Sequence, residues 1–272
     1  MPEPLRLRVV VPAYNEAARL PAALAEMSEA VRVLPRFHLV EILVADNGSA
    51  DDTALVARRE AARLDLPLRV LACPERGKAA ALVCAMTDPA TSAGVDFVLF
   101  TDADGATPLA ALAAFSPGPG EILVASRYAQ GSRIIHPGGD PLVRRIMSAG
   151  MRGLTRRLFS LPLTDTQCGF KLLPADAVEP LFRALRDRSW IFDVELLALA
   201  ARAGFRLREV PVTWTEMAGS SVDPLRDSVR SLIALGRIRL DLARRSTCPD
   251  RPVAPTMVTE RDRSTVEGST AR

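Results

Sequence analysis

The sequence of 272 residues contains little lysine and few cysteines. Two of its 35 basic residues are lysine, Lys78 and Lys171, and the rest are arginine. A bias in genome composition explains most of this excess of Arg, but such a chain also keeps Lys where a compact ammonium is needed and a planar guanidinium is not. The four cysteines are scattered and form no CxxC pair. Their spacing excludes a structural zinc site of the usual kind and indicates a reducing compartment, the cytoplasm.

Long apolar runs and glycine-rich nucleotide motifs are also missing. No apolar run reaches the roughly 18–20 residues that cross a bilayer, and no cleavable signal pattern precedes the first strand-like run. Neither GxxxxGK[ST] nor GxGxxG occurs, which argues against P-loop ATPases and NAD-type dehydrogenases. With 48% hydrophobic and 25% charged residues, the composition is that of a globular protein.

Charge is distributed unevenly along the chain. Residues 1–126 carry 11 basic and 16 acidic side chains, and residues 127–272 carry 24 and 16. Arg alternates with aliphatic residues over 142–159, whereas a nucleic-acid-binding surface would use aromatic stacking. The pattern favours an anionic membrane surface or a lipid phosphate and no nucleic acid. We therefore expect peripheral membrane association on the cytoplasmic face.

Short apolar runs alternate with helical segments in the first half, which predicts an α/β fold with a mostly parallel sheet covered by helices on both faces. The predicted strands are 7–11, 39–45, 68–72, 97–100, 122–125 and 207–213, with a polar turn and short strand over 164–173. The predicted helices are 16–33, 52–64, 77–86, 142–159, 192–203 and 224–245, with a short one after Pro108. We expect a folded domain over 1–245 and a disordered tail over 246–272.

Polar clusters follow the predicted strands, at the edge of the sheet where ligands bind in such folds. In Asp102-Ala103-Asp104, two carboxylates leave one strand and can hold Mg²⁺ or Mn²⁺ against a diphosphate. A solvated Asp-rich turn is the alternative, and the position after three strand–helix units favours the metal site. Asp46 is either an acceptor for a nucleoside or part of an Asx turn, and Lys78 at a helix start is a candidate phosphate contact.

Eight motifs, in chain order, resemble glycosyltransferase family 2 and, within it, the polyprenyl-phosphate sugar synthases. The glucosyl-transferring branch is the most similar and the mannosyl-transferring branch is second. The resemblance covers about residues 7–240. The motifs are VVVPAYNEAARL, EILVADNGSADDT, ERGKAAAL, FTDADGATP, ASRYAQGSR, LTDTQCGFKLL, WIFDVELLALA and EVPVTWTEMAGSS.

The resemblance implies a GT-A fold with C-terminal amphipathic helices. It implies an inverting transfer of a hexose from a donor of the UDP-glucose or GDP-mannose type to a polyprenyl phosphate. The implied nucleotide-sugar residues are Pro12, Tyr14, Glu16, Asp46 and Ala103, to which Lys78 is added from its position. The implied metal ligands are Asp102 and Asp104, and the implied acceptor-phosphate residues are Arg127, Arg144 and Ser148.

Two positions depart from the family pattern. Ala106 stands where mannose synthases have a metal-binding Gln, and Ser221 stands where a Lys usually contacts the diphosphate, with Arg226 as the possible substitute. A phosphate acceptor is already an anion, so the reaction needs no strong base. A hydroxyl acceptor is the alternative, and Asp193 or Glu195 would then be the catalytic base. A nucleotide-sugar-binding module without turnover is the third hypothesis.

Overall fold

The computed structural model describes residues 3–137, 142–217 and 224–245, without the side chains of 142–144 and 224–228. The expected tail over 246–272 and Ser221 therefore lie outside the described residues, as do the side chains of Arg144 and Arg226.

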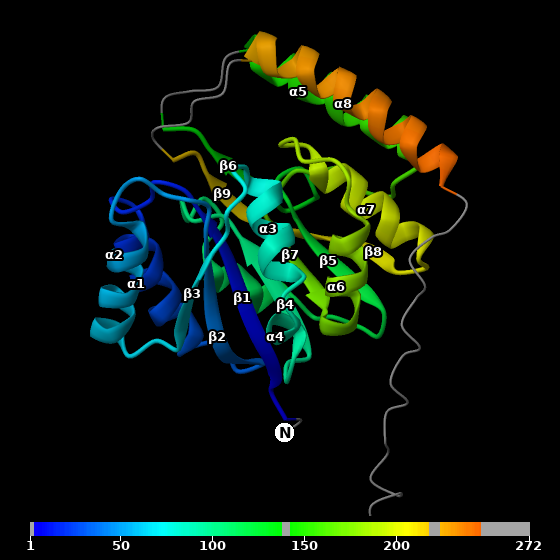
Figure 1. Cartoon of the computed structure of the whole chain (residues 1–272). Helices are drawn as coiled ribbons and strands as arrows, with labels where there is room; N and C mark the ends of the chain where they lie inside the picture. The colour runs from blue at the N-terminus through cyan, green and yellow to red at the C-terminus, as the bar shows by residue number, and fades with distance from the viewer. Residues whose placement is uncertain (1–2, 138–141, 218–223, 246–272) are drawn as a thin grey trace, which may run out of the picture.

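A seven-stranded sheet forms the centre of the molecule (Figure 1). Its strands are β1 (Leu5–Ala13), β2 (Phe37–Asp46), β3 (Leu68–Ala72), β4 (Phe97–Thr101), β5 (Glu121–Ser126), β7 (Phe170–Pro174) and β8 (Arg206–Pro211). They lie in the order β3-β2-β1-β4-β7-β5-β8. All pairs are parallel except those of β7, which runs antiparallel between β4 and β5. The mostly parallel sheet expected from the sequence is confirmed.

Helices cover both faces of this sheet, which explains why its strands are continuous apolar runs. On one face lie α1 (Leu20–Val31), α2 (Thr53–Leu64) and the 3-10 helix η1 (Leu109–Ala114). On the other lie α3 (Lys78–Met86), α4 (Pro89–Ser92), α6 (Ala175–Ala184) and α7 (Phe192–Arg202). The carboxyl ends of the parallel strands are left uncovered by these layers.

Two long helices, α5 (Leu142–Phe159) and α8 (Pro224–Arg244), lie side by side beyond the end of the sheet (Figure 1). Leu235, Ile238 and Leu242 of α8 are buried against the core. Other apolar side chains of the pair face solvent, among them Ile146, Val229, Leu232, Ile233 and Leu240. The amphipathic character expected for both helices is confirmed. Among the described residues, no helix has the length and apolarity that crossing a membrane requires.

The structure departs from the sequence prediction in three places. The strand expected over 207–213 is two strands, because the chain leaves the large sheet after β8. The second of them, β9 (Thr213–Thr215), pairs with β6 (Arg133–Ile135), which the sequence analysis did not predict. Helices α4 and α6 were also not predicted; α6 contains an internal proline, which weakens its helical signal. The first helix begins later than expected, since the backbone turns at Asn15 with a φ of 54°.

Candidate active site

Two cavities open at the carboxyl ends of the parallel strands. The smaller has a volume of about 290 Å³ and the larger about 440 Å³. The smaller is lined by Pro12, Ala13, Tyr14, Glu16, Arg19, Asn47, Lys78, Asp102, Ala103 and Asp104. Seven of the eight residues predicted to bind the nucleotide sugar or the metal therefore line this one cavity. They are Pro12, Tyr14, Glu16, Lys78, Asp102, Ala103 and Asp104.

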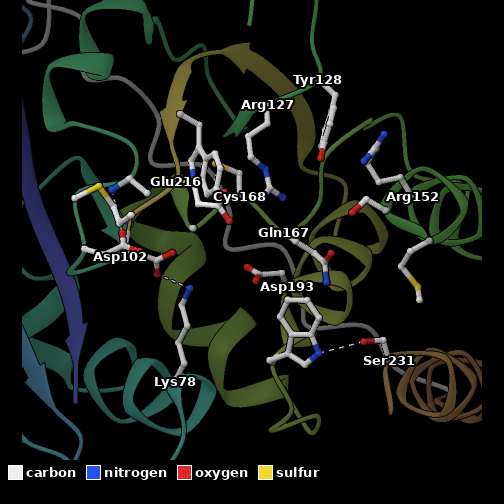
Figure 2. A pocket seen from close by; sticks show the side chains of 18 of the residues that line it. Lys78, Asp102, Arg127, Tyr128, Arg152, Gln167, Cys168, Asp193, Glu216 and Ser231 are labelled. Atoms are coloured by element: carbon white, nitrogen blue, oxygen red, sulfur yellow. Dashed lines mark hydrogen bonds and ion pairs between the residues drawn. The ribbon is translucent and has the colours of Figure 1, made fainter. Parts of the chain in front are cut away.

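The larger cavity extends from the same carboxylates toward α5 and α8. Its walls include Ala106, Arg127, Tyr128, Met147, Ser148, Met151, Arg152, Gln167, Cys168, Gly169, Trp190, Asp193, Trp214, Glu216, Met217 and Ser231. Lys78, Asp102 and Asp104 line both cavities. A molecule in one cavity and a molecule in the other would therefore meet at these three side chains. Figure 2 shows Lys78 and Asp102 at one end of the larger cavity and Tyr128 and Arg152 at the other, with Asp193 and Gln167 between them.

The carboxylates of Asp102 and Asp104 suit a divalent cation. Asp102 forms an ion pair with Lys78, and Asp104 accepts a hydrogen bond from the backbone N–H of Ala106 at 3.0 Å. Burial raises the pKa of the Asp104 carboxyl, and the nearby charge of Asp102 raises it further. Two carboxylates facing one ammonium leave an excess negative charge that a cation would neutralise. No cluster of three or more metal-ligating side chains occurs among the described residues, so the remaining ligands would be diphosphate oxygens and water.

Lys78 carries the opposite charge at the same point. Burial alone would lower its pKa, but the carboxylates of Asp102, Asp193 and Asp104 outweigh burial and raise it. Its ammonium therefore stays charged near neutral pH. It begins α3, where the helix dipole adds positive potential, so a diphosphate in the small cavity would meet both.

The loop before β7 packs closely against the carboxylate of Asp102. A Cβ atom on Gly169 would overlap the carboxylate of Asp102, so only glycine allows this close approach. Lys171, which is fully buried, donates to the backbone oxygen of Cys168 at 2.7 Å and to Asp193 at 2.6 Å. This segment thus contacts both the motif that contains Asp102 and the motif that contains Asp193, which lie far apart in the sequence.

We expect Gly169→Ala to lower transferase activity by about tenfold or more while the fold survives. The added methyl group would displace the Asp102 carboxylate from Lys78 and from the metal position, and misplacement of this kind by about 1 Å costs up to about 100-fold in rate. Initial rates and a thermal melt would measure the two effects. Gly150→Ala is the control, because a Cβ there meets open space. Wild-type activity in Gly169→Ala would contradict the assigned role of Asp102.

On the nucleotide side, some predicted residues carry local bonds of their own. Glu16 makes a bidentate ion pair with Arg19, at 2.6 and 2.7 Å. Asp46 accepts a hydrogen bond from the backbone N–H of Ser49 at 3.1 Å and is not among the residues that line the cavity. The next residue, Asn47, does line it, and its side-chain oxygen has no hydrogen-bond partner among the described residues. The sequence analysis did not single out Asn47 or Arg19.

On the acceptor side, Arg127 and Ser148 line the larger cavity as expected. The guanidinium of Arg127 makes two hydrogen bonds with the buried carboxylate of Asp165, at 2.7 and 2.9 Å. Arg144 lies in α5, and its side chain is outside the described residues. The sequence analysis missed Arg152, Gln167, Trp190 and Trp214, because residues from four separate segments converge only in the folded chain.

Cys168 and Asp193 are two further side chains at the wall of this cavity. Cys168 is a packed thiol with 2% of its surface exposed, and burial raises its pKa to about 11. Asp193, the candidate base for a hydroxyl acceptor, lies at the wall of the cavity and is paired with Lys171. Burial raises the pKa of Asp193, while Lys171 and Lys78 oppose this effect. Glu195 is buried elsewhere, where it is bonded to Arg245 and to the backbone of Arg186.

Comparison with known proteins places this arrangement in a family. The family model for glycosyl transferase family 2 matches residues 8–180, which include Lys78, Asp102 and Asp104, the three side chains that line both cavities. This chain belongs to glycosyl transferase family 2. The chain is 36% identical over 241 residues to a dolichyl-phosphate beta-glucosyltransferase of Drosophila melanogaster, covering 81% of this chain and 70% of that protein. It is 32% identical over 246 residues to the enzyme of the same name from Dictyostelium discoideum, covering 86% and 73%.

Solved structures of two sugar-transferring enzymes share the fold. A mannosyltransferase from Pyrobaculum calidifontis, in complex with GDP-mannose and Mn²⁺, superposes with a TM-score of 0.60 at 22% identity, covering 91% of this chain and 66% of that one. Glucosyl-3-phosphoglycerate synthase from Mycobacterium tuberculosis, in complex with UDP, also gives 0.60, at 18% identity and 87% and 80% coverage. The expected GT-A fold and the assignment as a glycosyltransferase are confirmed.

Proposed function

We propose that the protein transfers glucose from a nucleoside-diphosphate sugar to a polyprenyl phosphate, with UDP-glucose as the donor. The observation that carries this proposal is the pair of cavities that share Lys78, Asp102 and Asp104. One cavity suits a nucleotide, and the other combines arginine with methionine and tryptophan at its wall. The relatives named dolichyl-phosphate beta-glucosyltransferase support both the sugar and the acceptor.

The reaction needs few groups from the protein. An oxygen of the acceptor phosphate attacks the anomeric carbon from the face opposite the nucleotide, which inverts its configuration. The bond from that carbon to the β-phosphate oxygen breaks, and the nucleoside diphosphate leaves with the electron pair. The attacking oxygen of a phosphate dianion carries no proton, so no base is required.

The three residues that line both cavities would position the reactants and stabilise the leaving group. Lys78 would contact the diphosphate, and Asp102 and Asp104 would hold Mg²⁺ or Mn²⁺. When bound there, such an ion offsets the negative charge that develops on the leaving diphosphate. Tyr14, whose ring centre lies 5.8 Å from the guanidinium carbon of Arg76, and Asn47 would contact the nucleoside, as would Pro12 and Glu16 in the same cavity.

The larger cavity would receive the acceptor. We propose that Arg127, Arg144 and Ser148 contact its phosphate. Met147, Met151 and Met217 line the same cavity and suit the first units of a prenyl chain, because methionine packs well against irregular apolar groups. A phosphate at this depth needs charged partners, since its desolvation would otherwise be prohibitive.

A donor panel with a polyprenyl phosphate in detergent, in the presence of Mg²⁺ or Mn²⁺, tests this function. We expect UDP-glucose to give the highest rate of label transfer into solvent-extractable lipid. If no donor labels the lipid while a sugar or polyol hydroxyl is glycosylated, the acceptor is a hydroxyl and Asp193 becomes the candidate base. A clear preference for GDP-mannose would contradict the proposed sugar.

The helix pair α5–α8 would place this cavity against a membrane, on its cytoplasmic face. Its solvent-facing side combines Ile146, Ile233 and Leu240 with Arg156 and Arg157, all exposed. Aliphatic side chains would enter the interface while arginines contact anionic headgroups.

We expect the purified protein to float with vesicles of anionic lipid and to dissociate as the salt concentration rises. Each Arg near such a surface contributes about 1 kcal/mol, and salt screens this attraction. A variant with Ile233→Ser and Leu240→Ser should float less at low salt. Equal binding to neutral vesicles, or no binding at any salt concentration, would contradict peripheral docking through this surface.

A further inference from the structure

Most charged side chains of the larger cavity are bonded to a partner, and four of them form ion pairs. Lys78 pairs with Asp102, Asp193 with Lys171, and Arg127 with Asp165. Glu216 shares a hydrogen bond of 2.8 Å with His136. Charges that are already paired contribute little net attraction to an incoming ion.

Two lining residues differ from this pattern. Within the described parts of the chain, neither Asp104 nor Arg152 has a side chain of opposite charge within ion-pair distance. Asp104 lies at the end shared with the smaller cavity, and Arg152 lies at the opposite end, beside Tyr128 (Figure 2). The cavity therefore presents a carboxylate without an ion pair at the donor end and a guanidinium without an ion pair at the acceptor end.

Arg152 is held in place by an aromatic ring. Its guanidinium carbon lies 3.5 Å from the centre of the Tyr128 ring, which is within cation–π distance. Tyr128 lies between Arg152 and Arg127, whose guanidinium carbon is 5.6 Å from the same ring (Figure 2). Stacking on a ring face leaves the N–H groups at the edge of the guanidinium available for hydrogen bonds, so the interaction orients Arg152 without occupying its donors.

The backbone of Tyr128 is held by the turn after β5. The hydroxyl of Ser126 accepts hydrogen bonds from the backbone N–H groups of Tyr128 and Ala129, at 3.2 and 3.0 Å. The hydroxyl of Ser132 donates to the backbone oxygen of Ser126 at 2.6 Å. Ser126 has no exposed surface, so this turn gives Tyr128 a rigid base.

The position of Arg152 on α5 directs it to the cavity. One face of α5 lines the cavity with four residues, Met147, Ser148, Met151 and Arg152. The two pairs of neighbours are four positions apart, which is about one helical turn. Arg152 thus lines the same cavity as Ser148, whose hydroxyl is proposed to assist the acceptor, and as two methionines.

We infer that Arg152 binds the phosphate group of the acceptor and that Tyr128 positions it by stacking. This inference rests on the proposed function and assigns its acceptor site a residue that no sequence motif indicated. Arg127, whose charge is offset by Asp165, then attracts the phosphate less strongly than Arg152 does, and it also links the Tyr128 ring to Asp165.

The test uses farnesyl phosphate, a short prenyl phosphate, and farnesol, with the full-length protein and no membrane present. For Arg152→Ala we expect the KM for farnesyl phosphate to rise about 10- to 100-fold, the usual cost of one charge-assisted contact, with the KM for UDP-glucose unchanged. Arg59→Ala is the matched control, because it removes the same charge from an exposed helical position that lines neither cavity. Its two KM values should stay within about twofold of wild type.

Two pairs of variants separate binding from a merely structural role. Arg152→Lys keeps the charge and should recover part of the lost affinity, whereas Arg152→Gln should not. Tyr128→Phe keeps the ring and should resemble wild type, whereas Tyr128→Leu should raise the KM for farnesyl phosphate several-fold without lowering kcat.

Direct binding gives the decisive comparison. By titration calorimetry, wild-type protein should bind farnesyl phosphate more tightly than farnesol. Arg152→Ala should reduce the ratio of the farnesol Kd to the farnesyl phosphate Kd by at least tenfold. An unchanged ratio in a folded Arg152→Ala variant that still binds UDP-glucose overturns the inference and leaves the proposed function intact. If the wild-type protein neither binds farnesyl phosphate nor glucosylates it, the proposed function fails and the inference fails with it.

Discussion

Replacing Asp104 by Asn is expected to reduce glycosyl transfer by about 100-fold or more, since loss of one group that stabilises developing negative charge typically has an effect of this size. Asn has nearly the same shape as Asp and can keep the hydrogen bond from the N–H of Ala106. It cannot supply the negative charge that a divalent cation requires. Removing metal with EDTA should cause a similar loss in the wild-type enzyme, and Mn²⁺ or Mg²⁺ should restore it.

The control for this experiment is Asp65→Asn. Asp65 ends α2 with a φ of 52°, a conformation that Asn tolerates, and it does not line either cavity of the site. That variant should retain wild-type activity and metal dependence. Full activity of Asp104→Asn in the presence of EDTA would contradict the metal site, whereas loss of activity in Asp65→Asn would show that the assay reports general destabilisation.

The second large effect is expected on stability. Lys171→Met should lower the free energy of unfolding by about 3–5 kcal/mol, the usual range for breaking a buried ion pair. Lys171 has no exposed surface, and its removal leaves the carboxylate of Asp193 buried without its main partner. It also removes the donor to the backbone oxygen of Cys168. Urea unfolding monitored by circular dichroism would measure the change.

Two comparisons make this prediction specific. The double variant Lys171→Met, Asp193→Leu removes both charges and should be more stable than Lys171→Met alone, because no uncompensated carboxylate remains. Lys78→Met should cost less than about 1 kcal/mol, since its side chain and that of Asp102 are 35% and 37% exposed. A Lys171→Met variant that unfolds at the wild-type urea concentration would contradict the assigned role.

The two lysines show what the sequence could predict and what it could not. Their rarity among arginines indicated sites that need a compact ammonium, and both lie at the junction of the site or directly beneath it. The sequence could not indicate that Lys78 faces the cavities whereas Lys171 is buried. Burial depends on how β7 inserts between β4 and β5, and an antiparallel strand inside a parallel sheet leaves no distinct pattern in a short apolar run.

The sequence could indicate the position of residues that follow strand ends, but it could not indicate contacts that depend on tertiary packing. Asp102 and Asp104 follow β4 directly, so their placement needs only the rule for parallel sheets. The contact between Gly169 and Asp102 and the stack of Arg152 on Tyr128 join segments distant in the chain. Periodicity within a segment carries no information about such contacts.

The central claim is that a phosphate, rather than a hydroxyl group, attacks the sugar. The most direct measurement supplies labelled UDP-glucose with equal amounts of farnesyl phosphate and farnesol and analyses the products by mass spectrometry and NMR. The predicted result is a glucosyl farnesyl phosphate with a β-configured anomeric carbon bonded through oxygen to phosphorus, and no farnesyl glucoside. Glucose attached directly to farnesol, or UDP release with neither acceptor glucosylated, would contradict the account.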